Sequence, residues 1–190
     1  VTADDGQPAH HAFSQVLRVV VGNVDDPPAL AGPTAQNLNE DDSRTVPFTV
    51  SDIDTPLNQL FVYARSSNPA VLSDTSLVIG GSGANRTVTL APTTNRNGTA
   101  TVTLVVADST TTNTVSFEVT VQPVNDAPTL APLPNLVLPE DAGPRIVALT
   151  GIASGAADEA NPLTVTVTTS QPSLIPEPVV NYASPDAAGT

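Results

Sequence analysis

Residues 99–122 read TATVTLVVADSTTTNTVSFEVTVQ, and this stretch decides the fold. Apolar and polar residues alternate along Thr99–Val106 and again along Val115–Val121, which places one set of side chains on each face of a β-strand. Valine and threonine dominate both runs, and β-branched residues favour a pleated, half-buried surface. The polar segment between the runs is typical of a turn. The stretch therefore predicts two consecutive strands.

More strands are predicted before this pair, and helix signals are nearly absent. The complete set, lettered A to G in chain order, is Ala35–Leu38, Arg44–Ser51, Gln59–Arg65, Val71–Leu77, Arg86–Ala91, Thr99–Ala107 and Thr114–Gln122. Seven short strands in about 100 residues are typical of an immunoglobulin-like Greek-key sandwich, and the missing tryptophan and cysteine exclude the antibody subtype. The expected core is Val46, Phe48, Val50, Leu60, Val62, Leu77, Val88, Leu90, Val102, Leu104, Val106, Phe117, Val119 and Val121.

A motif repeats at a long, fixed interval. The stretch Val24–Leu30 (VDDPPAL) returns as Val124–Leu130 (VNDAPTL), and Glu40-Asp41 returns as Glu140-Asp141 in the same register. Such a period predicts tandem modules, and the prolines mark the linkers between them. We divide the chain into the C-terminal strands of a preceding module (1–22), a complete module (23–122) and the N-terminal part of a following module (123–190). The modules are expected to form an extended string.

Composition excludes several classes of chemistry. The chain has no cysteine and no lysine, so disulfides, thiolate zinc sites and Schiff bases are excluded. The net charge of −13 and the pI of about 4.1 repel nucleic acid and anionic membranes and attract cations. No apolar run reaches the roughly 18 residues of a membrane span. We therefore predict no nucleic-acid partner and no membrane insertion in this segment.

No enzyme is predicted. Carboxylates are plentiful, but a glycosidase also needs an aromatic platform for its sugar, and aromatic residues make up only 3% of the chain. A serine hydrolase needs a histidine, and the two histidines, His10 and His11, lie together in the incomplete first module. Adjacent residues point to opposite faces of an extended chain, so we interpret this pair as part of a solvated loop rather than a metal site.

Strand order predicts two clusters of oxygen ligands. The B–C and F–G turns should lie at the first linker, and the A–B and E–F turns should lie at the second. The first cluster contains Asp25, Asp26, Asp52, Asp54 and Asp108. The second contains Glu40, Asn125, Asp126 and Asp158, with Asp41, Asp42, Asn95, Asn97 and Glu159 expected nearby. Converging hard oxygens suit Ca²⁺, which takes 6–8 of them, whereas carboxylates without a cation repel each other and raise some pKa values.

These motifs carry a family resemblance that spans the chain. Four short segments show this resemblance: Val124–Pro128, Pro139–Asp141, Ser51–Asp54 and Val106–Asp108. They resemble the linker, early Pro-Glu, Asp-x-Asp and late aspartate elements of cadherin repeats, especially the cadherin-like and Ig-like tandem modules of bacterial surface proteins. The resemblance implies calcium at the junctions, with Ca²⁺ as the one cofactor, and a location outside the cell or on a bacterial surface.

The chain also departs from the cadherin pattern. Asn95-Arg96-Asn97 stands where cadherins place Asp-Arg-Glu, and Gly151-Ile152-Ala153 replaces the second Asp-x-Asp before an insertion around Ser154–Ala157. Neutral amide oxygens ligate calcium but lower the charge of the site, so calcium is expected mainly at the first junction. The alternative is that these acids are turn residues, because aspartate and asparagine side chains bond to the nearby backbone.

The sequence thus predicts a structural stalk or spacer of a repetitive surface or secreted protein that supports adhesion. Its expected partners are the neighbouring modules of the same chain, and other copies of itself. Two alternatives stay open. One is a module that binds a glycan or a protein. The other is a filament protomer, in which a neighbour's Phe13–Val21 supplies a strand to the third module by β-augmentation.

Overall fold

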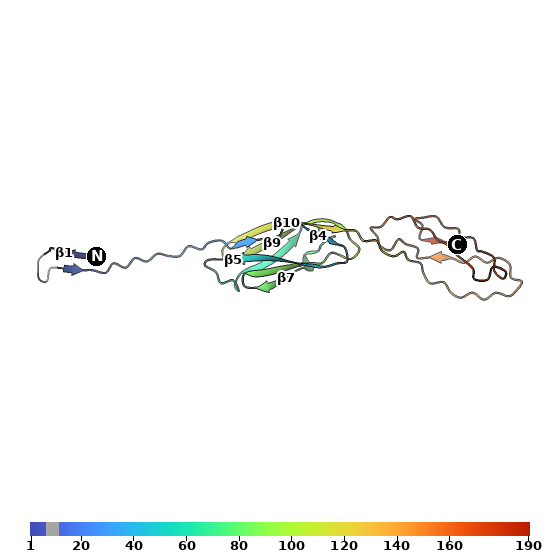
Figure 1. The fold of residues 1–190 in the computed structure, drawn as a ribbon, viewed down its shortest axis with the longest axis horizontal. Coiled ribbons are helices and arrows are strands. Elements are labelled where there is room, and N and C mark those ends of the chain that lie inside the picture. Colours follow the sequence, from blue (N-terminus) through green and yellow to red (C-terminus); the bar gives the residue numbers. More distant parts are fainter. Residues whose placement is uncertain (7–11) are drawn as a thin grey trace.

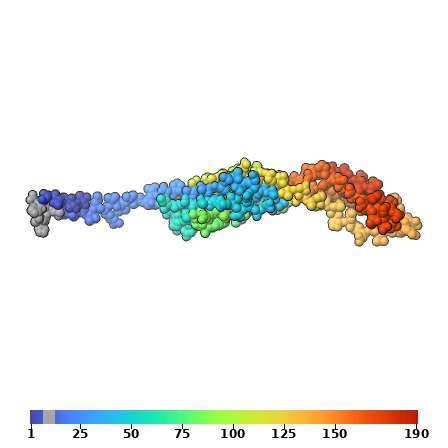
Figure 2. Space-filling model, viewed as in Figure 1, coloured from blue at the N-terminus to red at the C-terminus, as the bar shows by residue number. Residues whose placement is uncertain are grey.

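The computed structural model describes residues 1–6 and 12–190, and in that part of the chain it contains no α-helix. An N-terminal part (1–22), a central part (23–122) and a C-terminal part (123–190) follow one another in a row (Figure 1). The chain is thinnest towards its N-terminal end (Figure 2). None of the described segments is a helix long and apolar enough to cross a membrane. His10 and His11 lie outside the described residues. The strands are β1 (Thr2–Asp4), β2 (Ala12–Ser14), β3 (Ala29–Ala31), β4 (Gln36–Asn39), β5 (Arg44–Ser51), β6 (Phe61–Ser66), β7 (Leu77–Ser82), β8 (Asn85–Leu90), β9 (Gly98–Ala107), β10 (Thr112–Gln122), β11 (Leu149–Thr150) and β12 (Ala188–Gly189).

The central part is a sandwich of two four-stranded sheets. One sheet has the order β3-β5-β8-β7 and the other has the order β4-β10-β9-β6. All pairs within these sheets are antiparallel except β4 with β10, which is parallel. The immunoglobulin-like sandwich is confirmed. The first strand expected from the sequence, Ala35–Leu38, is β4, and the structure adds β3 as an edge strand of the other sheet.

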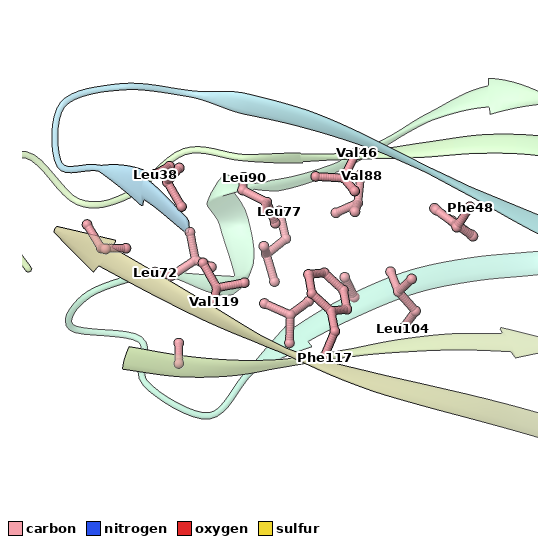
Figure 3. Close-up of a cluster of buried hydrophobic side chains, with 14 of the residues drawn as sticks. Leu38, Val46, Phe48, Leu72, Leu77, Val88, Leu90, Leu104, Phe117 and Val119 are labelled. Carbon is pink, nitrogen blue, oxygen red and sulfur yellow. The ribbon is translucent and has the colours of Figure 1, made fainter. Parts of the chain in front are cut away.

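The predicted core forms between the two sheets (Figure 3). Val88, Leu90, Val102, Leu104 and Val119 have no exposed surface, and burying one such side chain stabilises the fold by about 1.5–3 kcal/mol. Of the predicted core residues, only Val62 is no more than partly buried. The structure adds Leu38, Ala64, Val71, Leu72 and Ala100 to the core.

One predicted strand is wrong. Val71–Leu77 was expected to be extended, but the strand begins at Leu77 and a 3₁₀ turn (Asp74–Ser76) precedes it. Val71 and Leu72 are buried from a loop, where their N–H groups donate to the Asn68 carbonyl at 3.2 and 2.9 Å. Their burial needs no strand, because the turn already satisfies their backbone donors.

The flanking parts carry little regular structure. In the N-terminal part, β1 pairs with β2, and the residues that follow are extended and exposed. In the C-terminal part, β11 pairs with β12, and Leu149 and Ile152 are buried. A cavity of about 700 Å³ opens beside them, lined by Pro132, Leu133, Pro134, Leu136, Val137, Leu138, Pro139, Arg145, Ile146, Val147, Ala148 and Thr150. The apolar face of this part is therefore partly open.

Candidate metal centre at the second junction

Glu40 occupies the centre of the second junction. It follows β4, and the parallel pairing of β4 with β10 brings it to the end of β10, where its N–H donates to the Gln122 carbonyl at 2.9 Å. Its Oε1 accepts a hydrogen bond of 2.7 Å from the Val124 N–H. The residue is only 2% exposed and is the one charged or polar residue in the buried core set of the described chain.

A loop of the C-terminal part lies against the linker from the other side. Gly155 adopts a φ of +116°, and an added Cβ there would lie 2.6 Å from Asp126 Cβ and 2.7 Å from the Ala127 carbonyl oxygen. Glycine is therefore required for this close approach. The loop brings Asp158 and Glu159 to the junction, which is the position expected for them from strand order.

Two hydrogen bonds fix these acids. The Asn97 Nδ2 donates to Asp158 Oδ2 at 2.5 Å, and the Asp126 N–H donates to Glu159 Oε1 at 2.6 Å. Asn97 belongs to the turn before β9 in the central sandwich, and Asp126 belongs to the linker. The loop is thus bonded to both neighbours, and it holds the carboxylates of two modules and the linker close to one another.

Four carboxylate oxygens at this junction are buried without a hydrogen-bond partner. They are Glu40 Oε2, Asp126 Oδ2, Asp158 Oδ1 and Glu159 Oε2. A buried charged oxygen that loses water without gaining a donor is costly, and neighbouring negative charges add repulsion. Such unpaired, negatively charged oxygens attract cations.

The electrostatic strain appears in two pKa values. The hydrogen bond from Val124 lowers the pKa of Glu40. Burial, the hydrogen bond that a protonated Glu40 makes to Asp158, and the negative charges of Asp158 and Asp41 outweigh it, and the pKa is raised. The pKa of Asp126 is raised first by burial and then by the charges of Glu159, Asp41 and Asp158. Both shifts have the sign expected for clustered carboxylates without a counterion.

These carboxylates do not form a complete metal-binding site. Within residues 1–6 and 12–190, no three histidine, cysteine, aspartate or glutamate side chains are already arranged to hold a metal ion. Asn125, a predicted ligand, uses its Oδ1 to accept a hydrogen bond from Asn161 at 3.1 Å. The sequence predicts that Glu159 lies at this junction but does not include it among the calcium ligands. The insertion that brings it to the linker is visible in the sequence, but the contact that this insertion makes is not.

The first junction also assembles as expected, but through hydrogen bonds. Asp54 accepts bonds from Asn23 Nδ2 at 2.9 Å and from the Asp26 N–H at 2.8 Å, which joins the B–C turn to the linker. Asp25 Oδ2 accepts a bond from the Thr110 hydroxyl of the F–G turn. The linker and both turns are thus connected without a cation.

The other two acids at this junction are engaged in their own turns. Asp52 Oδ1 accepts the N–H groups of Asp54 and Thr55 at 2.8 and 2.6 Å. Asp108 Oδ1 accepts those of Thr110 and Thr111, each at 2.6 Å, and these bonds hold its pKa down to about 2. Of the predicted first-junction ligands, Asp52 alone has a buried oxygen without a partner, Oδ2. The unsatisfied oxygens therefore gather at the second junction, whereas sequence favoured the first.

Comparison with known proteins assigns the chain to no family. No protein-family model matches the sequence. No curated protein matches it. Among solved structures, titin domain M7 is similar at 12% identity and a TM-score of 0.40, covering 53% of this chain and 99% of its own. Domains 1–6 of the surface-layer protein SbsC are similar at 14% identity and a TM-score of 0.39, covering 94% of this chain and 23% of their own. Such TM-scores assign neither a family nor a function.

Proposed function

We propose that the chain is a segment of an extended structural stalk, in which a Ca²⁺ ion held by Glu40, Asp126, Asp158 and Glu159 braces the second junction. The observation that carries this proposal is the burial of Glu40, whose Oε2 has no hydrogen-bond partner although Asp158 lies beside it. The ion neutralises the repulsion between these acids and draws them inward around one centre. Backbone carbonyls, amide oxygens and water complete its 6–8 oxygen ligands.

The ion would further connect three segments that hydrogen bonds already join. They are the turn after β4, the linker and the loop of residues 154–160. A cation that binds only the native arrangement stabilises it by RT ln(1 + [Ca²⁺]/Kd), about 2.7 kcal/mol at a hundredfold excess over Kd. Its role is mechanical, because it fixes the turn, the linker and the loop relative to one another.

The same site supports a location outside the cell or on a bacterial surface. Calcium sites in extracellular modules have Kd values on the order of 10⁻⁴–10⁻³ M, so they fill only where calcium is abundant. The row of modules in Figure 1 suits a spacer that holds another part of a protein away from a surface. Such a spacer would support adhesion when the part that it holds away from the surface is adhesive.

The test is calcium titration of the whole chain, followed by calorimetry and by thermal unfolding in calcium and in chelator. Glu40→Gln is the informative variant, because it keeps an oxygen that accepts from Val124 but removes the buried charge. Glu140→Gln is the matched control, because Glu140 holds the same repeat position but is exposed. Calcium should raise the unfolding midpoint of the parent and of the control, but not of Glu40→Gln. A parent without a calcium response would refute the brace.

Asp52→Asn with Asp54→Asn separates the two junctions. We expect this double variant to keep the calcium response, because the proposed ligands lie at the other pole of the module. A double variant that loses the response, while Glu40→Gln keeps it, would place the ion at the first junction instead. Small-angle scattering in chelator and in calcium then measures whether the ion changes the bend between the central and C-terminal parts.

A further inference from the structure

Strand β6 is an open edge of the central sandwich. It is the last strand of its sheet, and no other strand of the described chain pairs with its outer side. The Ser67 N–H donates to the Thr101 carbonyl, so the pairs 61/107, 63/105 and 65/103 are the hydrogen-bonded ones and the residues between them point their backbone groups away from β9. Val62 and Ala64 therefore offer their N–H and C=O groups at the edge.

The outward face of this edge carries an aromatic and cationic row. Phe61 is 65% exposed, and its ring centroid lies 5.4 Å from that of the partly exposed Tyr63. The Arg65 guanidinium carbon lies 5.4 Å from the centre of the Tyr63 ring. Two neighbouring aromatic rings thus reach the surface on one strand, which is unusual where no partner covers them. Proteins commonly protect such edges with proline, bulges or charged side chains, and this strand has only the single charge of Arg65.

The row of Phe61, Tyr63 and Arg65 is complementary to the same row of a second, antiparallel copy of the strand. An antiparallel copy in register about Tyr63 places Phe61 opposite Arg65 of the second copy, and Arg65 opposite Phe61. Tyr63 meets its own equivalent, and on the inner side Val62 meets Ala64. Cross-strand aromatic pairs and cation–π pairs are both favourable contacts. A two-fold axis at Tyr63 pairs each of positions 61 to 65 of the strand with a complementary partner.

We propose that two copies of the chain pair side by side through β6, in antiparallel register centred on Tyr63. Val62 of each copy exchanges both backbone hydrogen bonds with Ala64 of the other, which extends the sheet across the axis. Asp74 ends the pairing, because its carboxylate already accepts the Ser66 N–H at 2.7 Å and occupies the next edge position. The interface is self-complementary, as a closed dimer requires.

The geometry sets the direction of the two stalks. Antiparallel β6 strands make the two chains run in opposite directions, so the contact suits stalks that approach from two opposed surfaces. Both copies carry a net charge of −13, and the interface is small, so the pairing is weak and needs salt to screen the repulsion. We expect a Kd on the order of 0.1–1 mM. The contact does not use the carboxylates of either junction, so it is independent of calcium.

Charge exchange within the row tests the register. Phe61→Arg places two arginines opposite each other in its own dimer, and Arg65→Glu places a carboxylate opposite a ring. Sedimentation equilibrium of the whole chain, in chelator and in calcium at moderate salt and at protein concentrations up to about 1 mM, should show concentration-dependent dimerisation of the parent and should show each variant as a monomer. An equal mixture of the two variants should dimerise again. In the mixed dimer the new arginine of one copy faces the new glutamate of the other, and one native pair of Arg65 with Phe61 is kept.

Val78→Arg is the matched control, because it places a charge on the exposed outer face of β7, the edge strand of the other sheet. It should associate like the parent, and circular dichroism checks that every variant is folded. A parent that stays monomeric would overturn the proposal, as would variants that all associate equally, which would place the contact elsewhere, such as the open C-terminal face. Dimerisation that vanishes in chelator would instead place the contact at the cation site.

Discussion

The Val124 N–H donates a 2.7 Å hydrogen bond to Oε1 of Glu40, and this bond ties the turn after β4 to the linker that leaves β10. It uses one oxygen of the carboxylate and leaves the other buried among acids. A single residue thus both closes the sandwich at one pole and brings negative charge to the junction.

Glu40 should be easier to replace by glutamine than by alanine. In chelator, Glu40→Gln keeps the acceptor for Val124 and removes the repulsion by Asp158 and Asp41, so its unfolding midpoint should equal or exceed that of the parent. Glu40→Ala leaves the Val124 N–H without this acceptor and should cost about 1–3 kcal/mol. Thermal unfolding of both variants measures the contrast. Equal destabilisation by the two substitutions would show that the charge is not under strain.

Gly155→Ala should displace the loop from the linker. An added Cβ would meet Asp126 and Ala127, and the positive φ adds backbone strain, so the contact should weaken by about 1–3 kcal/mol. Hydrogen exchange at the Asp126 N–H, which donates to Glu159, should accelerate. Gly143→Ala is the control, because nothing lies within 4 Å of its added Cβ. Equal exchange in both variants would contradict the close approach.

Asp108 should stabilise the central module in a pH-dependent way. Its pKa is lowered from 3.8 to about 2 by the N–H groups of Thr110 and Thr111, so its stabilising effect is present above pH 3.8 and is lost as the pH falls toward 2. The midpoint of Asp108→Ala should lie a few degrees below that of the parent near neutral pH, and the gap should narrow in acid. A gap that stays constant down to about pH 2 would show that the charge of Asp108 does not matter.

Leu104 should be among the most sensitive core positions. It is fully buried between the two sheets, so Leu104→Ala should cost about 2–5 kcal/mol through lost burial and a cavity. Val137→Ala removes an apolar side chain that is 91% exposed, and it should change the unfolding midpoint little. Chemical denaturation measures both. Similar losses in the two variants would mean that the core extends beyond the central sandwich.

Much of the sandwich was readable from the sequence. Period-two alternation identified β5, β9 and β10 because each has one face in the core and one in solvent. The same signal failed for β7, whose glycines carry no alternation, and for Val71 and Leu72, which are buried from a loop. Burial of a loop residue leaves no periodic trace, so the sequence assigned that apolar pair to a strand.

The acidic residues at the two junctions show the same difference between what the sequence predicts and what only the structure reveals. Strand counting brought the right residues to each pole, because turns at one end of a sandwich must lie together whatever their composition. It did not distinguish Asp54, which accepts two hydrogen bonds, from Glu40, which keeps a bare buried oxygen. That difference depends on which donors come within about 3 Å, and donors from distant segments have no sequence signature.

The sequence by itself determined the β-sandwich, its core and the grouping of acids at two junctions, because alternation and turn residues act over a few positions along the chain. Only the tertiary structure decided which junction keeps unsatisfied carboxylates and which strand presents an open aromatic edge. Those properties arise when segments far apart in sequence meet, as Glu40 meets Asp158 and as β6 becomes the last strand of its sheet. Burial and hydrogen-bond satisfaction are set by these meetings, and local pattern carries no record of them.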